Sequence, residues 1–406
     1  MTKNTGTHVL ITNNTLAHRA GSEMYVLDIA LALLKRGYNP IAYSTVLGDV
    51  ADELRKATIP VINNLNALVT PPDLIHGQHH LDAMTAMLRF PTTPALYFCH
   101  GWLPWEETPP LFPTITHYVA VDNLCQERLL TTAGIKQNAI RLLYNFVDLA
   151  QFKPRLQLPE KPKAALVFSN NAAEHNFVSA IRAACLRFGI ERIDVAGFNS
   201  GNVAINPAAL LPQYDVVFAK ARCALEAMAV GCAVVVADLP GLGGMVSTGN
   251  MKAYRRLNFG VRTLQTANIT EANIFAQLLL YNPNDAHQVS AWIRQDADSE
   301  LAFNTLETYY QEALAMAPSL LAQPSLAIST AASAYLQSLA PVIKTRILAE
   351  QRAIQAEQQQ SQLQQLNEHH QLALQNKQTE LDSIINSRTW QLFSYYRKFR
   401  RWLASW

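Results

Sequence analysis

The chain has 406 residues, with 33 Lys and Arg against 31 Asp and Glu and a formal net charge of +2. Because single hydrophobic cores stop growing near roughly 250–300 residues, this length indicates more than one domain. The near-neutral charge gives no reason to expect a nucleic-acid partner. The cysteines are odd in number and form no CxxC pair, which indicates a reducing compartment.

The first 150 residues alternate between short β-branched runs and helical patterns, which is typical of a parallel sheet covered on both faces. The first apolar run is too short for a signal peptide, so a cytoplasmic location is expected. The clearest helix, 23–37, ends in a basic turn followed by Gly37. The other expected elements are 8–12, 39–45, 49–59, 60–64, 73–78, 95–101, 117–123, 124–132 and 140–148.

A Pro-rich, charged stretch over 152–163 lacks apolar periodicity and is interpreted as an interdomain linker. A second alternating series follows it, so the sequence predicts an α/β fold with two Rossmann-like domains, 1–153 and 164–316. The facing cleft of such domains is the expected ligand site. The elements of the second series are 164–170, 174–188, 192–197, 214–220, 222–230 and 232–238.

Beyond residue 316 the alternation stops. An Ala/Ser/Pro-rich connector is expected over 317–342, and a long helix or short coiled coil over 343–385, with a possible homo-oligomer or complex formed through it. The most apolar run, 223–239, carries Glu226 and Asp238 and is too short for a membrane span.

The residue pattern of the tail, 386–406, predicts an amphipathic helix that lies on a membrane. Arg397, Lys398 and Arg401 fall opposite a broad apolar face, a pattern typical of helices in an anionic headgroup layer. The alternative is that this face packs on the protein itself or on a second copy. The apolar face consists of Leu392, Tyr395, Tyr396, Phe399, Trp402, Leu403 and Trp406, with Phe393 at its edge.

Several segments in order resemble the GT-B glycosyltransferases, specifically the retaining group that builds bacterial polysaccharides and lipopolysaccharides. The family's first strand, Gly-rich loop and helix are similar to HVLITNNTLAHRAGSEMYVLDIALALLKRGY, and its Asp-x-x-His segment is similar to PDLIHGQHHLDAM. The passage before the family's linker is similar to YNFVDLAQFKP. YDVVFAKARCALEAMAVGCAVVVADLPGLGGMV resembles the strand, helix, strand and Gly loop of the donor domain. The resemblance runs from Val9 to Leu314, and the C-terminal helices lie outside it.

The resemblance implies roles for individual residues. Gly21 and Glu23 match the family's Gly-rich loop and the Glu that follows it. His100 matches a histidine that faces the sugar. Glu226 matches the Glu that accepts hydrogen bonds from the nucleotide ribose. Gly241, Gly243 and Gly244 match the loop where backbone approaches the donor.

Elementary chemistry supports these assignments and leaves alternatives open. A glycine loop before a helix offers free N–H groups to anionic oxygens, but it also suits a tight strand-to-helix turn. A lone histidine such as His100 is often structural. Glu226, in an apolar helical run, needs either a ligand or an ion pair with Lys220 or Arg222.

The sequence departs from the family in its donor site. Eight positions before Glu226, where the family has another Glu, stands Phe218, in what looks like a shortened loop. Asn170, Asn171 and His175 replace the Arg and Lys that clamp the diphosphate. We therefore expect Lys220 and Arg222 to stabilise the leaving diphosphate, with Arg262 as a weaker candidate, although the first two would also fit a solvated pair at a helix start.

The sequence thus predicts a metal-independent hexosyltransferase that needs no cofactor, because HGQHH lacks a carboxylate partner and the fold that the sequence resembles is typically metal-independent. Its substrates would be a nucleotide sugar and a saccharide or lipid-linked acceptor, at the cytoplasmic face of the inner membrane. The alternatives are an inverting transferase or an epimerase of the same fold, and a non-catalytic scaffold that organises a polysaccharide assembly through its coiled coil.

Overall fold

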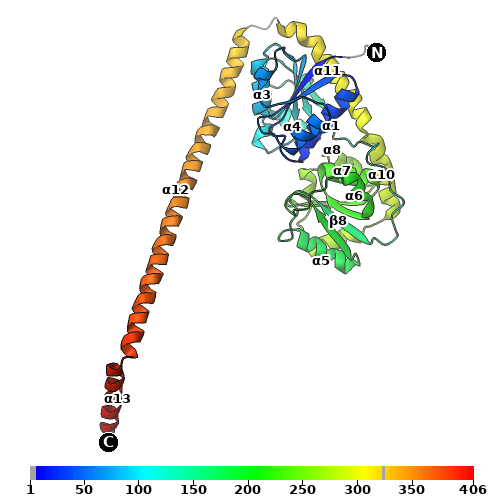
Figure 1. The fold of residues 1–406 in the computed structure, drawn as a ribbon. Helices are drawn as coiled ribbons and strands as arrows, with labels where there is room; N and C mark the ends of the chain where they lie inside the picture. Colours follow the sequence, from blue (N-terminus) through cyan, green and yellow to red (C-terminus); the bar gives the residue numbers. More distant parts are fainter. Residues whose placement is uncertain (1–5, 322–324) are drawn as a thin grey trace. The chain divides into compact units, whose positions relative to one another are not determined.

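The computed structural model describes residues 6–321 and 325–406 and divides into two compact units, Met1–Ala332 and Ser333–Trp406. The first unit contains two sheets covered by helices (Figure 1), which we call the N-lobe and the C-lobe. The predicted α/β fold with two Rossmann-like domains and a C-terminal helical extension is confirmed.

The N-lobe sheet has seven strands in the order β3-β2-β1-β4-β5-β6-β7, all parallel. Its central strands are buried almost throughout, as expected for continuous apolar runs covered on both faces. The elements are β1 His8–Thr12, α1 Gly21–Lys35, β2 Asn39–Tyr43, α2 Asp49–Lys56, β3 Val61–Ile62, β4 Leu74–Gln78, α3 His80–Arg89, β5 Ala95–Cys99, β6 Ile115–Ala120, α4 Asn123–Thr131 and β7 Ile140–Leu142, with short 3-10 helices at Leu65–Ala67, Trp105–Glu107 and Gln137–Ala139.

The C-lobe sheet has the order β12-β11-β10-β8-β9, and only β12 runs antiparallel to its neighbour. Helices α5 and α7 both end at a glycine in the left-handed conformation, Gly189 and Gly231. The elements are β8 Ala164–Phe168, α5 Val178–Phe188, β9 Arg192–Ala196, α6 Pro207–Leu210, β10 Val216–Ala219, α7 Ala221–Val230, β11 Ala233–Asp238, β12 Gly241–Met245, α8 Met251–Arg256, α9 Glu271–Leu278 and α10 Pro283–Asp296, with 3-10 helices at Leu211–Gln213 and at η5, Val261–Leu264.

Helix α11, Ser299–Leu321, returns to the N-lobe and contributes Phe303, Leu306 and Tyr310 to its core. The sequence prediction had placed residues up to 316 with the second domain. Tyr310 also hydrogen-bonds His76 of β4, with 2.6 Å between the hydroxyl and Nδ1. The N-lobe is therefore completed by chain that follows the C-lobe.

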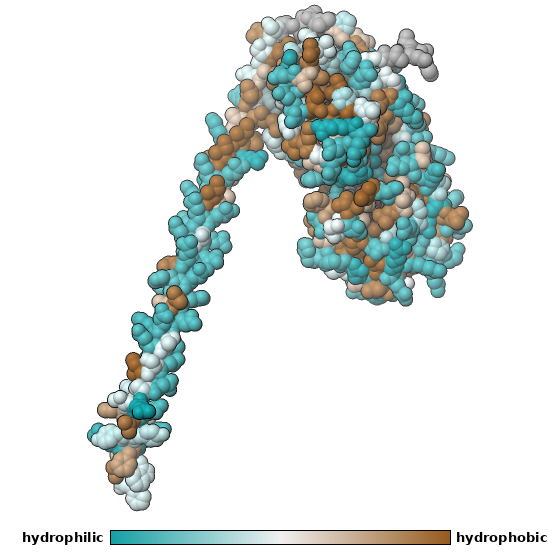
Figure 2. Space-filling view, in the orientation of Figure 1, coloured by the Kyte–Doolittle hydropathy of each residue, from teal (hydrophilic) through white to brown (hydrophobic). Residues whose placement is uncertain are grey.

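The second unit is almost entirely helical. Helix α12, Ser325–Ile385, begins within the first unit and continues through the second, and α13, Arg388–Leu403, follows it. The segment expected as a connector, 317–342, is helical in its described parts, since 317–321 belong to α11 and 325–342 to α12; residues 322–324 lie outside the described residues. Figure 2 shows α12 as largely hydrophilic, with scattered apolar residues.

Within the described residues, α12 is also the one helix that is long and apolar enough to cross a bilayer by length and composition. Its apolar part lies in the stretch free of charged residues before Lys344, a segment that the sequence analysis had treated only as a connector.

Candidate functional site

The two lobes meet where strands of both sheets end. The loop after β1 brings His18 next to Phe198, which follows β9, with 5.9 Å between ring centroids. From α1, Asp28 reaches Arg222 in the first turn of α7, with 2.5 Å between Oδ2 and Nη1. Ligands of open α/β sheets bind outside the carboxyl ends of the strands. This junction is therefore the candidate site.

Lys220 lies between β10 and α7 and is engaged by a buried carboxylate. Its Nζ is 2.5 Å from Oδ2 of Asp238, which ends β11 and is completely buried. Asp238 also accepts hydrogen bonds from the Ser169 hydroxyl and the Leu239 N–H. Burial raises the pKa of Asp238, but Lys220 and these donors outweigh it and hold the pKa below its ordinary value. Much of the charge of Lys220 is thus already compensated.

Glu226 is paired with Arg222, the ion pair considered above as the alternative to a ribose role. The Arg222 Nε is 2.7 Å from Glu226 Oε1, and the Glu226 side chain is only 6% exposed. Burial raises the pKa of Glu226, and Arg222 opposes that shift. Asp28 and Glu226 together surround the guanidinium, and this network joins the lobes.

Helices α1 and α7 both start at this junction without a side-chain cap. Gly21 opens α1, and a Cβ added to it would meet no atom within 4 Å. Glu23 is buried in the first turn and accepts a hydrogen bond from Ser22. Helix N-termini with unfilled backbone N–H groups attract anions. These helix ends therefore suit phosphate oxygens.

Gly241, Gly243 and Gly244 belong to strand β12, whereas the sequence analysis placed them in a loop. An added Cβ would lie 2.3 Å from the Leu264 carbonyl oxygen at Gly241 and 2.6 Å from the Thr263 carbonyl oxygen at Gly243. The close packing of β12 on η5 explains why Gly241 and Gly243 lack a side chain, whereas an added Cβ at Gly244 would lie 2.6 Å from Oε1 of Gln277 in α9.

Arg262, in η5, also contacts the N-lobe. Its Nη1 is 2.8 Å from Glu127 Oε1 of α4, and its guanidinium lies 6.0 Å from the Trp102 ring centroid. Both groups of this ion pair are partly exposed. The observed contacts of Arg262 thus join η5 to the N-lobe.

His100 follows β5, as expected, with its backbone N–H donating to Glu107 Oε2 at 2.9 Å. Its ring meets that of Tyr25 edge-on at 4.6 Å. Burial lowers the pKa of His100 to about 4, against a weaker opposite effect of Glu107, so the imidazole is neutral. Glu107 also lies 3.3 Å from Nε2 of His79, whose Nδ1 accepts the Asn14 N–H.

Sequence reasoning missed Asp28, Glu107, Asp238 and Tyr25. Asp28 and Tyr25 occur in an ordinary amphipathic helix, and nothing local distinguishes them from other helical residues. Asp238 does carry a signal, because an acidic residue ends a buried strand at the edge where ligands bind.

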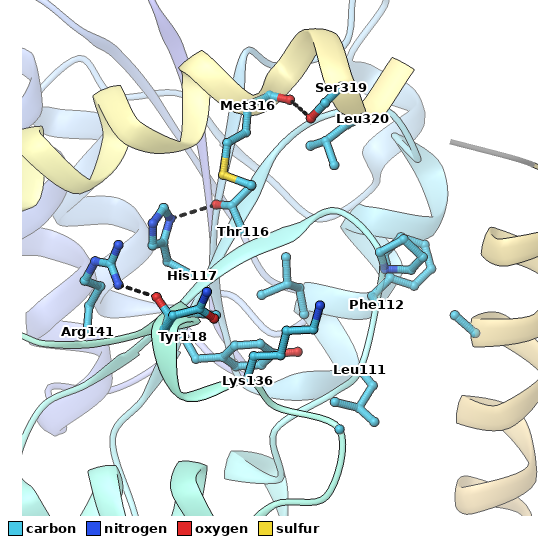
Figure 3. Close-up of a pocket in the computed structure, with 16 residues that line it drawn as sticks. Leu111, Phe112, Thr116, His117, Tyr118, Lys136, Arg141, Met316, Ser319 and Leu320 are labelled. Atoms are coloured by element: carbon cyan, nitrogen blue, oxygen red, sulfur yellow. Dashed lines mark hydrogen bonds between the residues drawn. The ribbon is translucent and has the colours of Figure 1, made fainter. Parts of the chain in front are cut away.

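A cavity of about 710 Å³ lies elsewhere (Figure 3). It is lined by Phe112, His117 and Lys136 around the amino end of β6, and by Met316 and Leu320 of α11. Because the strands of this sheet are parallel, this edge is opposite to the one that carries His100.

Across residues 6–321 and 325–406, no group of three or more His, Cys, Asp or Glu side chains is arranged to hold a metal ion. The expectation of metal-independent chemistry stays a prediction.

Comparisons with known protein families and solved structures show what this chain is similar to. Residues 19–151 match the family described as Glycosyltransferase Family 4. A glycosyltransferase from Rickettsia africae ESF-5 is similar in structure, with 13% identity and a TM-score of 0.55 over 77% of this chain and 99% of that one. HepE from Anabaena, solved in complex with UDP and glucose, gives 15% identity and a TM-score of 0.52 over 75% of this chain and 100% of that one.

At these identities the structural likeness shows the fold alone, and comparison with curated protein sequences gave no match. The chain has the GT-B fold, and its residues 19–151 are similar to Glycosyltransferase Family 4.

Proposed function

We propose that this protein transfers a hexose from a nucleoside diphosphate to a hydroxyl group, with retention of anomeric configuration and without a metal. The observation that carries the proposal is the junction of the lobes, where the uncapped ends of α1 and α7 are joined through Asp28, Arg222 and Glu226. The matched family and the UDP and glucose bound by HepE support it.

In this proposal the Glu226 carboxylate accepts hydrogen bonds from the ribose diol, a geometry that two carboxylate oxygens suit well. The leaving diphosphate is stabilised by the first turn of α7 and by Lys220 and Arg222. Three carboxylates already contact these two cations, namely Asp28, Glu226 and Asp238. Backbone N–H groups therefore carry more of the stabilisation than the sequence alone suggested.

No side chain is assigned as a nucleophile. Departure of the diphosphate and attack by the acceptor occur on one face of the sugar, so catalysis depends on positioning and on charge stabilisation. Closure of the lobes around the donor would exclude water and limit hydrolysis.

The acceptor is proposed to be a lipid-linked saccharide of a surface polysaccharide, reached at the cytoplasmic face of the inner membrane through α13. The aromatic residues of this helix are at least 46% exposed, and none is buried against the described chain. Such a face, beside Arg397, Lys398 and Arg401, suits an anionic headgroup layer.

Calorimetric titration with UDP, GDP, ADP, CDP and dTDP tests the donor site. We expect one of them to bind, with affinity reduced at least tenfold by Glu226→Ala. Glu271→Ala removes a carboxylate from an exposed ion pair with Arg187 in the same lobe and serves as the matched control. Binding of none of the five would contradict the proposal. NMR of the product's anomeric proton separates retention from inversion or epimerisation.

A scaffold is the second candidate, favoured by the exposed apolar residues along α12. They are Ile347, Ile354, Leu363, Leu366, Leu374, Leu381 and Ile384, all about half exposed or more. Analytical ultracentrifugation distinguishes a self-associating chain from a monomer.

The membrane role of α13 is tested by removing the residues after Ser387. Unchanged flotation of the shortened chain with anionic vesicles would exclude α13 as the anchor.

A further inference from the structure

The cavity of Figure 3 lies where β6 and β7 begin and is formed entirely within the first unit. It is lined by segment 111–113 before β6 and by Gly134, Lys136 and Asn138 before β7. The end of α11 and Ala331 of α12 form the facing wall. At about 710 Å³, its volume is typical of small-ligand sites. Among the described residues that line it, none belongs to the donor junction.

Much of the cavity lining is apolar, and part of that surface is uncovered. Phe112 and Leu320 are buried, whereas Leu111 is 46% and Met316 43% exposed. Apolar surface that water still reaches gains free energy when another apolar group covers it. This side of the cavity therefore favours a ligand with a hydrocarbon part.

The polar side of the cavity carries an excess of positive charge. Glu312 Oε2 lies 3.0 Å from Nη2 of Arg141 and 3.1 Å from Nε2 of His117, so a single carboxylate serves both groups. Burial and Arg141 lower the pKa of His117 against the effect of Glu312, so the imidazole is neutral at pH 7.

Lys136 supplies the uncompensated charge. Its side chain is exposed and forms no ion pair with the residues that the structure describes. Figure 3 shows this side chain pointing into the cavity. An ammonium group beside an apolar wall suits a ligand that is anionic at one end and apolar at the other.

The helical wall of the cavity belongs to a stretch of chain that suits a lipid environment. Residues 313–343 contain no charged side chain, and α12 is long and apolar enough to cross a bilayer by length and composition. In the first unit, Leu326 of this stretch is 73% exposed. Exposed apolar surface of this kind marks protein or membrane contacts. A lipid would contact the cavity and this stretch together.

We propose that the cavity binds an anionic phospholipid of the bilayer, with the phosphate at Lys136 and the hydrocarbon part along Phe112, Met316 and Leu320. A small polar anion would leave the apolar wall uncovered, and an uncharged lipid would leave Lys136 without a counter-ion. The inference does not depend on the proposed function, because the cavity and His100 lie at opposite edges of the sheet.

Calorimetric titration of the full chain with two soluble short-chain lipids, dihexanoyl phosphatidylglycerol and dihexanoyl phosphatidylcholine, tests the charge. We expect the anionic lipid to bind at least tenfold tighter, and Lys136→Gln to weaken it about tenfold while leaving the phosphatidylcholine unchanged. Lys56→Gln, at an exposed lysine of the same lobe, is the matched control. Helix α13 is identical in all these chains, so differences between them report on the cavity.

Met316→Glu tests the apolar wall, because it places a carboxylate where the hydrocarbon part is expected. It should weaken both lipids about tenfold and reduce flotation with phosphatidylglycerol vesicles. Leu301→Glu, at a 55% exposed position of the same helix, is the matched control. Thermal unfolding checks that the Met316→Glu chain folds; if it does not, the exposed Lys136 decides the test.

Three results would overturn the inference. The first is equal affinity for the anionic and the zwitterionic lipid, and the second is a Lys136→Gln chain that binds lipid as tightly as Lys56→Gln. The third is binding of inorganic phosphate as tight as that of phosphatidylglycerol, which would indicate a site for small anions without a role for the apolar wall.

Discussion

Replacement of Arg222 by glutamine tests the network that joins the lobes. Arg222 contacts two carboxylates of unequal burial, because the side chain of Asp28 is 27% exposed and that of Glu226 only 6%. Removing the guanidinium leaves Glu226 as an almost buried carboxylate without its observed cation. Removing the Asp28 charge leaves Arg222 still paired with Glu226.

The expected magnitudes follow from this asymmetry. Breaking a buried ion pair by deleting one partner costs about 3–5 kcal/mol, and the 27% exposure of Arg222 places Arg222→Gln near the lower end, at about 3 kcal/mol. The Asp28 pair is more exposed, so Asp28→Asn should cost about 1 kcal/mol. The double variant Arg222→Gln with Glu226→Gln removes both charges and should recover about 2 kcal/mol of the loss.

Urea unfolding of the full chain, followed by tryptophan fluorescence, measures these differences. Arg187→Gln, in an exposed ion pair with Glu271, is the control and should cost less than about 0.5 kcal/mol. The reasoning is refuted if Asp28→Asn destabilises as much as Arg222→Gln. It is equally refuted if adding Glu226→Gln brings no recovery.

Four further predictions concern the backbone and the imidazole. Gly21→Ala should change the unfolding free energy by less than about 0.5 kcal/mol, since no atom lies within 4 Å of the added Cβ, but it should weaken nucleotide binding in calorimetry. Gly241→Ala should lower the unfolding free energy by about 3 kcal/mol in urea titrations, because its Cβ would lie 2.3 Å from the Leu264 carbonyl oxygen. Ala221→Gly should raise the thermal midpoint and stabilise by about 0.5–1 kcal/mol, because Ala221 has a φ of 49°. The pKa of His100 falls to about 4 in the fold, against an ordinary value near 6.5, so the unfolded chain binds more protons between these values. Lowering the pH from 7 to 5 should destabilise the chain, with about 2 kcal/mol of the loss due to His100 and further loss due to His76 and His80, whose pKa values burial also lowers. In urea titrations, His100→Gln should therefore reduce the pH-dependent loss by about 2 kcal/mol.

The sheets were predictable because their signals are local. Runs such as 8–12 and 233–238 are apolar and β-branched, and they alternate with amphipathic helices, so the doubly wound fold follows from neighbouring residues alone. The segment 317–342 was harder to interpret. Pro318 and Pro341 suggested an irregular connector, but both lie inside helices, where the many alanines of this segment favour helix.

The charge state of the site was not predictable, because its partners are distant in sequence. Asp28 is 194 residues from Arg222, and no sequence pattern near either residue predicts that they form an ion pair. The role of the β12 glycines was also not predictable, because the residues that they contact are distant in sequence. They resemble a ligand loop, but the carbonyl groups that exclude a side chain at Gly241 and Gly243 come from Thr263 and Leu264.

The shortened connection before α7 has a consequence for sugar recognition. Counting eight residues back from Glu226 leads to Phe218, which lies within β10 and is completely buried in the core. The strand ends at Ala219 and the helix begins at Ala221, so Lys220 alone connects them. Ala221 adopts a positive φ of 49° to make this turn.

No loop remains here to carry a glutamate toward a sugar. A glutamate placed at Phe218 would instead be buried among apolar side chains, at a cost of several kcal/mol. In the proposed reaction, this connection therefore supplies no carboxylate to the sugar.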